Sequence, residues 1–359
     1  WFDGQRWHGV DLPERGISNY VEAVLPTSDG SVWFGRQDGG IAVRKGGTWV
    51  RHTRASGLPL DRVNALAETR GPGGERLIWA GTYGGGLARW DGIRWKVTGT
   101  AEGLPNGRIW KLVPRSGPAG EELWVGSEQG GLARVDAEGR VVATYPGLPA
   151  VSVNGILEVP GPEGEPEIWA STFGAGLAHW SRGRWTTFGL REGLPSLFAT
   201  DLAESQSLTG ERVLWVATAA GLVRFEAGRF RVLTVRWGLP VDTVYRLKRD
   251  AGRKDALWIG TSGAGVLHHQ EGGWRIHDAP SGLPGNTVLA LGRGRDGTLL
   301  AGTPEGLARF EGNRWQGVPM PPDLRNARVN AVLEEPGGGA LWLATLGGLA
   351  RFKEGRWER

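Results

Sequence analysis

The chain has 359 residues, of which 40% are hydrophobic and 22% are charged, and its formal net charge is +4. This balance is typical of a globular protein with a sizeable core, and it excludes a disordered chain. There is no cysteine, which excludes disulfides and thiolate metal sites, and no apolar run approaches the roughly 18 residues of a membrane-spanning helix. Because the arginines are scattered and form no single run, we expect no nucleic-acid partner.

A short motif recurs along the chain with a period of about 40 to 45 residues, which is typical of propeller blades. It consists of an aliphatic residue, Trp, another apolar residue and then small residues, as in Leu257-Trp258-Ile259-Gly260-Thr261. There are eight copies, and Leu300 replaces the Trp in the seventh. The motif Trp residues are Trp33, Trp79, Trp124, Trp169, Trp215, Trp258 and Trp342.

Each copy of the motif lies within a longer unit that predicts four short strands, named a to d here. In the second repeat a Gly-Leu-Pro turn at 57–59 precedes strand a at 63–66, and the motif at 78–82 is strand b. A Gly-rich turn at 84–86 precedes strand c at 87–90, and Asp91-Gly92 is a hairpin turn before strand d at 94–97. Four such strands form an antiparallel meander, and meanders stacked around an axis cover each other's faces.

We therefore predict a single all-β propeller over 1–359 with four-stranded antiparallel blades, most simply eight of them, with seven as the alternative. The expected repeats are 18–55, 56–101, 102–145, 146–191, 192–236, 237–280, 281–319 and 320–359, preceded by an outer strand and turn at 1–17. That first segment aligns with strand d of the other repeats, so it either closes the last blade or completes a blade upstream of this segment. Both possibilities imply that the segment belongs to a longer protein.

Most of the 19 Trp residues fall in two columns of this alignment. Seven are in strand b and seven more are in strand d, at Trp7, Trp49, Trp95, Trp185, Trp274, Trp315 and Trp357. A ligand site needs each aromatic residue once, whereas packing between blades needs one in every blade. We therefore interpret both columns as structural.

The linked motifs resemble the two-component regulator propeller family, whose repeats form sensor ectodomains of hybrid histidine kinases and related signalling proteins. The residues that carry the resemblance are Gly238-Leu239-Pro240, Val244 to Leu247, Leu257 to Thr261 and Gly265-Val266-Leu267, with equivalents in almost every repeat. The resemblance implies a ligand-binding sensor domain that is not catalytic in itself, in a periplasmic or other extracytoplasmic location. It would be linked to a membrane only through flanking segments.

In a propeller the d-to-a and b-to-c turns surround one mouth of the central channel, and here these turns differ from blade to blade. Aromatic and guanidinium groups in such turns can stack on sugar rings and bind small anions. The alternative is that they are solvated turn residues. The candidate ligand-binding residues on this upper rim are Tyr20, Arg62, Tyr83, Arg108, Trp110, Phe173, Phe198, Tyr245 and Arg328.

An enzyme is the alternative function, as a propeller lyase or glycosidase, and a protein-interaction scaffold is another. Asp61 and Asp242 occupy equivalent positions in the second and sixth repeats, which a ring of eight would place too far apart for a pair of glycosidase carboxylates. The six His residues have no metal-ligand spacing, and there is no Gly-x-Ser-x-Gly nucleophile motif. We therefore predict no catalytic residues, no metal and no cofactor, and a small molecule, an oligosaccharide or a protein as partner.

Overall fold

The computed structural model describes residues 21–45, 48–117, 120–148, 152–161, 166–241, 243–250, 252–270, 273–294, 297–320, 328–334, 340–345, 348–353 and 356–358. The predicted outer strand at 1–17 and the candidate Tyr20 lie outside these residues, as does Asp242. The side chain of Trp357 also lies outside them.

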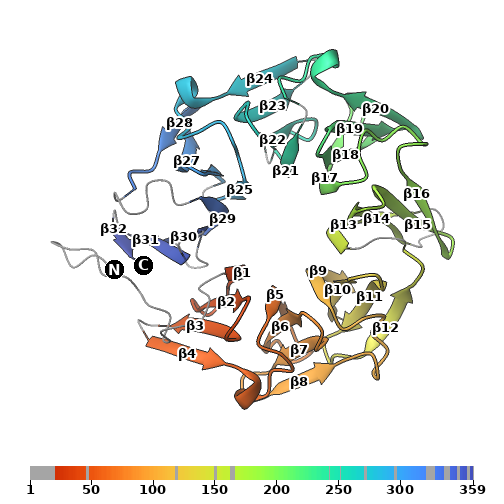
Figure 1. Ribbon diagram of the computed structural model, residues 1–359, viewed down its shortest axis with the longest axis vertical. Helices are drawn as coiled ribbons and strands as arrows, with labels where there is room; N and C mark the ends of the chain where they lie inside the picture. Colours follow the sequence, from red (N-terminus) through yellow and green to blue (C-terminus); the bar gives the residue numbers. More distant parts are fainter. Residues whose placement is uncertain are drawn as a thin grey trace.

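The described strands form eight four-stranded sheets, each an antiparallel meander of consecutive strands, arranged as a ring (Figure 1). The prediction of an all-β propeller with four-stranded antiparallel blades is confirmed. In chain order the sheets are β1 Val21–Pro26, β2 Val32–Arg36, β3 Ile41–Lys45, β4 Thr48–His52; β5 Val63–Arg70, β6 Arg76–Thr82, β7 Leu87–Trp90, β8 Trp95–Thr98; β9 Ile109–Gly117, β10 Gly120–Ser127, β11 Gly131–Asp136, β12 Val141–Tyr145; β13 Ser152–Pro160, β14 Pro166–Phe173, β15 Leu177–Ser181, β16 Arg184–Phe188; β17 Ala199–Gln206, β18 Arg212–Thr218, β19 Gly221–Glu226, β20 Arg229–Leu233; β21 Val244–Arg249, β22 Leu257–Thr261, β23 Val266–Gln270, β24 Gly273–His277; β25 Ala290–Arg293, β26 Leu299–Thr303, β27 Gly306–Glu311, β28 Arg314–Gly317; β29 Val329–Glu334, β30 Ala340–Thr345, β31 Gly348–Lys353 and β32 Arg356–Glu358.

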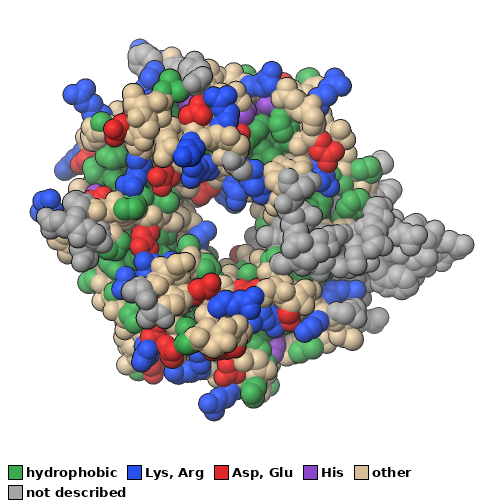
Figure 2. All heavy atoms as spheres, turned by 180° about the vertical axis from the view of Figure 1, so that it is seen from behind, with side chains coloured by type: hydrophobic (Ala, Val, Ile, Leu, Met, Phe, Trp, Pro, Cys, Tyr) green, Lys and Arg blue, Asp and Glu red, His purple; other side chains and the backbone are tan. Residues whose placement is uncertain are grey.

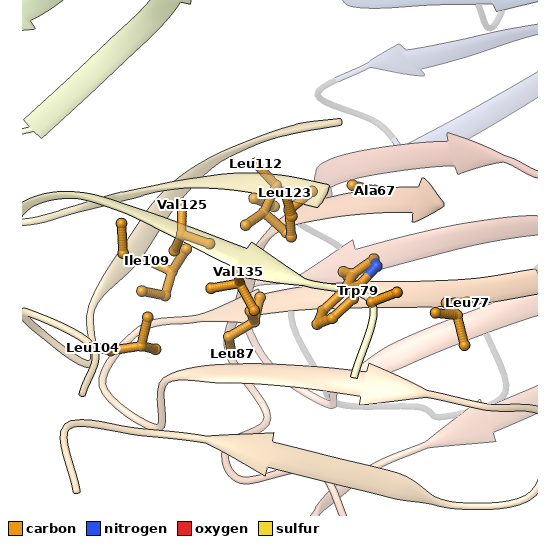
Figure 3. Close-up of a cluster of buried hydrophobic side chains, with 13 residues drawn as sticks. Ala67, Leu77, Trp79, Leu87, Leu104, Ile109, Leu112, Leu123, Val125 and Val135 are labelled. Atoms are coloured by element: carbon orange, nitrogen blue, oxygen red, sulfur yellow. The ribbon is translucent and has the colours of Figure 1, made fainter. Parts of the chain in front are cut away.

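The core lies between the blades and not within any one of them. Figure 3 shows the cluster between the second and third blades, where Trp79 of β6 packs with Leu123 and Val125 of β10 and Val135 of β11. Equivalent clusters join every blade to the next, with the strand-b Trp, or Leu300 in the seventh blade, facing the following sheet. The seven strand-b Trp side chains are between 1% and 6% exposed and lie within these inter-blade clusters.

The last blade packs against the first in the same way. Trp342 of β30 shares a cluster with Val32, Phe34 and Ala42 of the first blade. The ring centroids of Phe34 and Trp342 are 5.3 Å apart. Hydrophobic contacts therefore also link the last sheet to the first.

The small residues of strand b are explained by close approach between blades. A Cβ on Gly81 of β6 would lie 2.6 Å from a methyl carbon of Ile109, the first residue of the next strand a. No real Cβ contact is that short, so a glycine is required for the two strands to approach.

The Gly-Leu-Pro turn has a related explanation. Gly57 adopts a φ of 101°, which ends the short 3-10 helix η1, Arg54–Ser56, in the left-handed region. The following Leu58 is buried in the core between the first two blades. The helices η3, Val235–Trp237, and η4, Ala279–Ser281, end in the same way.

Candidate binding site at the central channel

Strand a carries a β-bulge near its start in seven of the eight sheets. The pairing with strand b skips one residue there, for example between Val63 and Ala65 of β5. A bulge leaves its extra residue outside the ladder and changes the direction of its side chain. The skipped residues are Glu22, Asn64, Trp110, Asn154, Thr200, Tyr245 and Asn330.

Three of these bulge residues form hydrogen bonds to the next blade. The side-chain amide of Asn64 donates to the carbonyl of Ile109 over 3.2 Å, and that of Asn154 donates to Ala199 over 2.8 Å. The hydroxyl of Thr200 donates to the carbonyl of Val244 over 2.9 Å. These side chains therefore have a structural role, although the Asn154 carbonyl oxygen and the Thr200 oxygen keep capacity to accept further hydrogen bonds.

Four of the predicted rim residues meet in one cluster at the turns of the second and third blades. The Arg62 guanidinium carbon lies 4.1 Å from the centroid of the Tyr83 ring, and that of Arg108 lies 5.1 Å from it. Trp110 packs edge-on against Tyr83 with centroids 5.6 Å apart. Glu128, from the b-to-c turn of the third blade, accepts hydrogen bonds from Arg108 and from the Trp110 indole N–H, both over 3.1 Å.

The other candidates lie apart from that cluster. Phe173 and Phe198 form a separate pair from the fourth and fifth blades, with centroids 4.5 Å apart and side chains 48% and 43% exposed. Tyr245 is the bulge residue of the sixth blade. Arg328 is exposed and donates from Nε to Asn330 in the eighth blade. The structure thus brings together four of the eight predicted residues that it describes and separates the rest.

A cavity of about 470 Å³ lies beside this cluster, where the innermost strands of the third to sixth blades meet the channel. It is lined by Trp110, Lys111, Val153, Asn154, Thr200, Asp201 and Arg246. Figure 2 shows the channel as an open hole at the centre of the ring, with Lys and Arg side chains on part of its margin. Only Trp110 of the lining residues is among the predicted candidates, so the sequence interpretation missed the charged part of the site.

The charged lining residues are held in a partly desolvated setting. Burial raises the pKa of the Asp201 carboxyl, although it accepts backbone N–H bonds from Leu247 and Leu202, each over 2.9 Å. Burial lowers the pKa of the Lys111 ammonium, an effect that attraction to Asp201 opposes and repulsion from Arg246 reinforces. The Arg246 guanidinium is oriented by donating to the carbonyl of Tyr245 over 2.9 Å.

The described residues contain no group of three or more His, Asp or Glu side chains that could hold a metal ion. Asp61, considered above as a catalytic carboxylate, accepts the backbone N–H of Arg54 over 2.8 Å and so stabilises the η1 turn. Within the same residues no helix is long and apolar enough to cross a membrane.

Comparison with solved structures identifies the fold. Over 96% of this chain, the extracellular domain of the hybrid two-component system BT3049 from B. thetaiotaomicron superposes with a TM-score of 0.50 at 18% identity. This chain covers 53% of that one, about half its length. The likeness to two-component sensor ectodomains that the repeat motifs predict is confirmed at the level of fold.

Two further structures share the architecture. The computationally designed protein Ika8 superposes with a TM-score of 0.65 at 16% identity, covering 94% of this chain and 97% of Ika8. The WD40 propeller domain of Doa1 gives a TM-score of 0.53 at 11% identity, covering 92% of this chain and 95% of that domain. No protein-family model and no curated protein sequence matches the chain.

Proposed function

We propose that this propeller is a ligand-binding sensor domain of a signal-transduction protein, and that it is not catalytic in itself. The observation that carries the proposal is the channel cavity, which combines an aromatic residue, an asparagine, a threonine and three charged residues from four blades. Such a mixture, in which a few polar groups converge on a preformed hollow, is typical of small-molecule sites. The ligand would be a small molecule or an oligosaccharide that enters from the rim cluster.

The location proposed for the domain is extracytoplasmic. It is supported by the fold shared with the extracellular domain of BT3049 and by the repeat motifs quoted above. The signalling partner would be an output domain elsewhere in the parent protein.

We also propose that the eight sheets form one closed ring in solution, in preference to seven blades with a detached repeat. The continuity of the inter-blade clusters from Trp342 to Phe34 supports this arrangement.

The proposed site is tested by calorimetric titration and thermal shift against a panel of oligosaccharides and small acids. For a ligand found in this way, we expect Trp110→Ala and Arg108→Ala each to weaken binding by about 1 to 3 kcal/mol, because a stacking ring or a charge-assisted hydrogen bond is lost. Phe173→Ala is the matched control, since it removes an exposed aromatic from the other rim pair. Loss of binding in Phe173→Ala alone would place the site in the fourth and fifth blades instead.

A protein-interaction scaffold is the second candidate function. The exposed Phe173 and Phe198 pair is the observation that favours it, because neighbouring exposed aromatics are typical of interface anchors.

A further inference from the structure

One position of strand a, the residue after the bulge, is small in most blades and charged in three. The residue that follows the bulge position is Ala or Gly in five blades, namely Ala23, Ala65, Gly155, Ala290 and Ala331. In the third, fifth and sixth blades the same column contains Lys111, Asp201 and Arg246. All three of these long side chains line the one channel cavity, so the charge is confined to one arc of the ring.

The single carboxylate in this set is already engaged. One oxygen of Asp201 accepts the N–H of Leu202 and the other accepts that of Leu247 in the next blade. Asp201 thus joins the fifth and sixth blades, and no ion pair of 4.0 Å or less links it to Lys111 or Arg246 among the described residues.

Two cations therefore face the cavity with their charge unmatched at close range. The Lys111 ammonium has no hydrogen-bond partner among the described residues, and the Arg246 guanidinium is held in place by one bond to a backbone carbonyl. Neighbouring acceptors are the carbonyl oxygen of Asn154 and the hydroxyl oxygen of Thr200. One amide N–H of Asn154 and the hydroxyl proton of Thr200 are used for inter-blade bonds. The cavity thus offers positive charge for an anion and oxygen acceptors for hydroxyl groups.

From this arrangement we infer that the ligand of the channel site is a small hydroxylated carboxylate, bound with its carboxylate at Lys111 and Arg246 and its hydroxyls toward Asn154 and Thr200. This inference rests on the proposed function, because it names the ligand class of the same site. Ammonium and guanidinium groups bind a carboxylate through charge-assisted hydrogen bonds, which are stronger in a partly desolvated pocket.

The chain has six lysines, which allows a direct test at Lys111. Reductive methylation with ¹³C adds a reporter to each lysine and keeps its charge, and Lys111→Arg assigns the signal of Lys111. Gluconate and sorbitol form a matched pair of probes, since they differ only in the carboxylate. We expect gluconate to shift the Lys111 signal in a saturable way and sorbitol to leave it in place.

In Arg246→Gln the gluconate concentration at half-saturation should rise about 10- to 100-fold, as expected when a hydrogen bond between charged groups is lost. Arg275→Gln is the control, because it removes the same charge from the outer strand of the same blade. Equal shifts with sorbitol, or a Lys111 signal that moves no more than that of Lys96, would overturn the inference. If gluconate fails these tests, calorimetric titration of the Trp110→Ala variant with any other ligand found in the screen decides the proposed function separately. Loss of binding in that variant would support the channel site of the sensor proposal. Unchanged binding would contradict that proposal.

Discussion

Histidine side chains form part of the Trp packing between and within blades. His268 lies flat on Trp258 with centroids 3.6 Å apart, and His179 lies on Trp169 at 3.9 Å. His52 stacks on Trp33 and accepts a hydrogen bond at Nδ1 from the indole N–H of Trp95 over 3.2 Å. Because that nitrogen is an acceptor, His52 is neutral in the folded protein.

This arrangement predicts a loss of stability in mild acid. Burial lowers the pKa of His52 and of His277 to about 4, from an ordinary value of 6.5. Between pH 6.5 and 4 the unfolded chain therefore binds more protons than the folded one, so stability falls as the pH falls through this window. We expect His52 alone to account for about 2 to 3 kcal/mol of the loss.

Urea unfolding between pH 7.5 and pH 4.5 measures this effect, with His52→Gln as the comparison. The variant should be less sensitive to pH than the wild type. A His52 pKa near 6.5 by NMR, with identical pH dependence in both proteins, would show that the ring is protonated without cost to the fold.

At the scale of the strand, β18 illustrates how strand b joins two blades. Trp215 is 1% exposed, packs with Leu257 and Ile259 of the following blade and donates its N–H to Ser205 over 2.9 Å. We expect Trp215→Ala to lower the free energy of unfolding by about 3 to 5 kcal/mol, because a cavity is left between the sheets. Denaturant titration measures the change, and Ile93→Ala, at an 86% exposed position, should have little effect. An unchanged midpoint in Trp215→Ala would mean that this column is not core.

The strands and their order were predictable because each motif recurs many times. An ambiguous segment, such as the copy with Leu300 in place of Trp, can therefore be assigned to strand b by its alignment with the other repeats. The charged residues of the cavity were not predicted as site residues. Alternation along a strand has a period of two, and one extra residue at the bulge changes which later side chains share a face. Nothing in a single segment marks the bulge at Trp110. The signal in the sequence is the column of Ala and Gly that Lys111, Asp201 and Arg246 interrupt, one residue after the column that contains Trp110 and Tyr245.

For the whole molecule, ring closure makes a prediction that needs no ligand. If the ring is closed, Trp342 lies in an interface like that of Trp215, and Trp342→Ala should lower stability by a similar amount, about 3 to 5 kcal/mol. In an open chain, or in seven blades with a detached repeat, the contact of Trp342 with Phe34 would be absent. Denaturant unfolding of the two variants side by side distinguishes these arrangements, and a Trp342→Ala protein as stable as the wild type would contradict closure.

The contacts between blades also have one direction, from each blade to the next blade along the chain. Asn64, Asn154 and Thr200 each reach forward to the next blade along the chain, and each strand-b side chain packs forward as well. Each blade therefore packs one flank against the following blade and the other flank against the preceding one. Head-to-tail contacts of this kind can accommodate one more copy of the repeat without any new type of interface. A duplicated repeat would meet neighbours that it already fits, so blade number in such a ring can change by duplication while the flanks that hold it together stay the same.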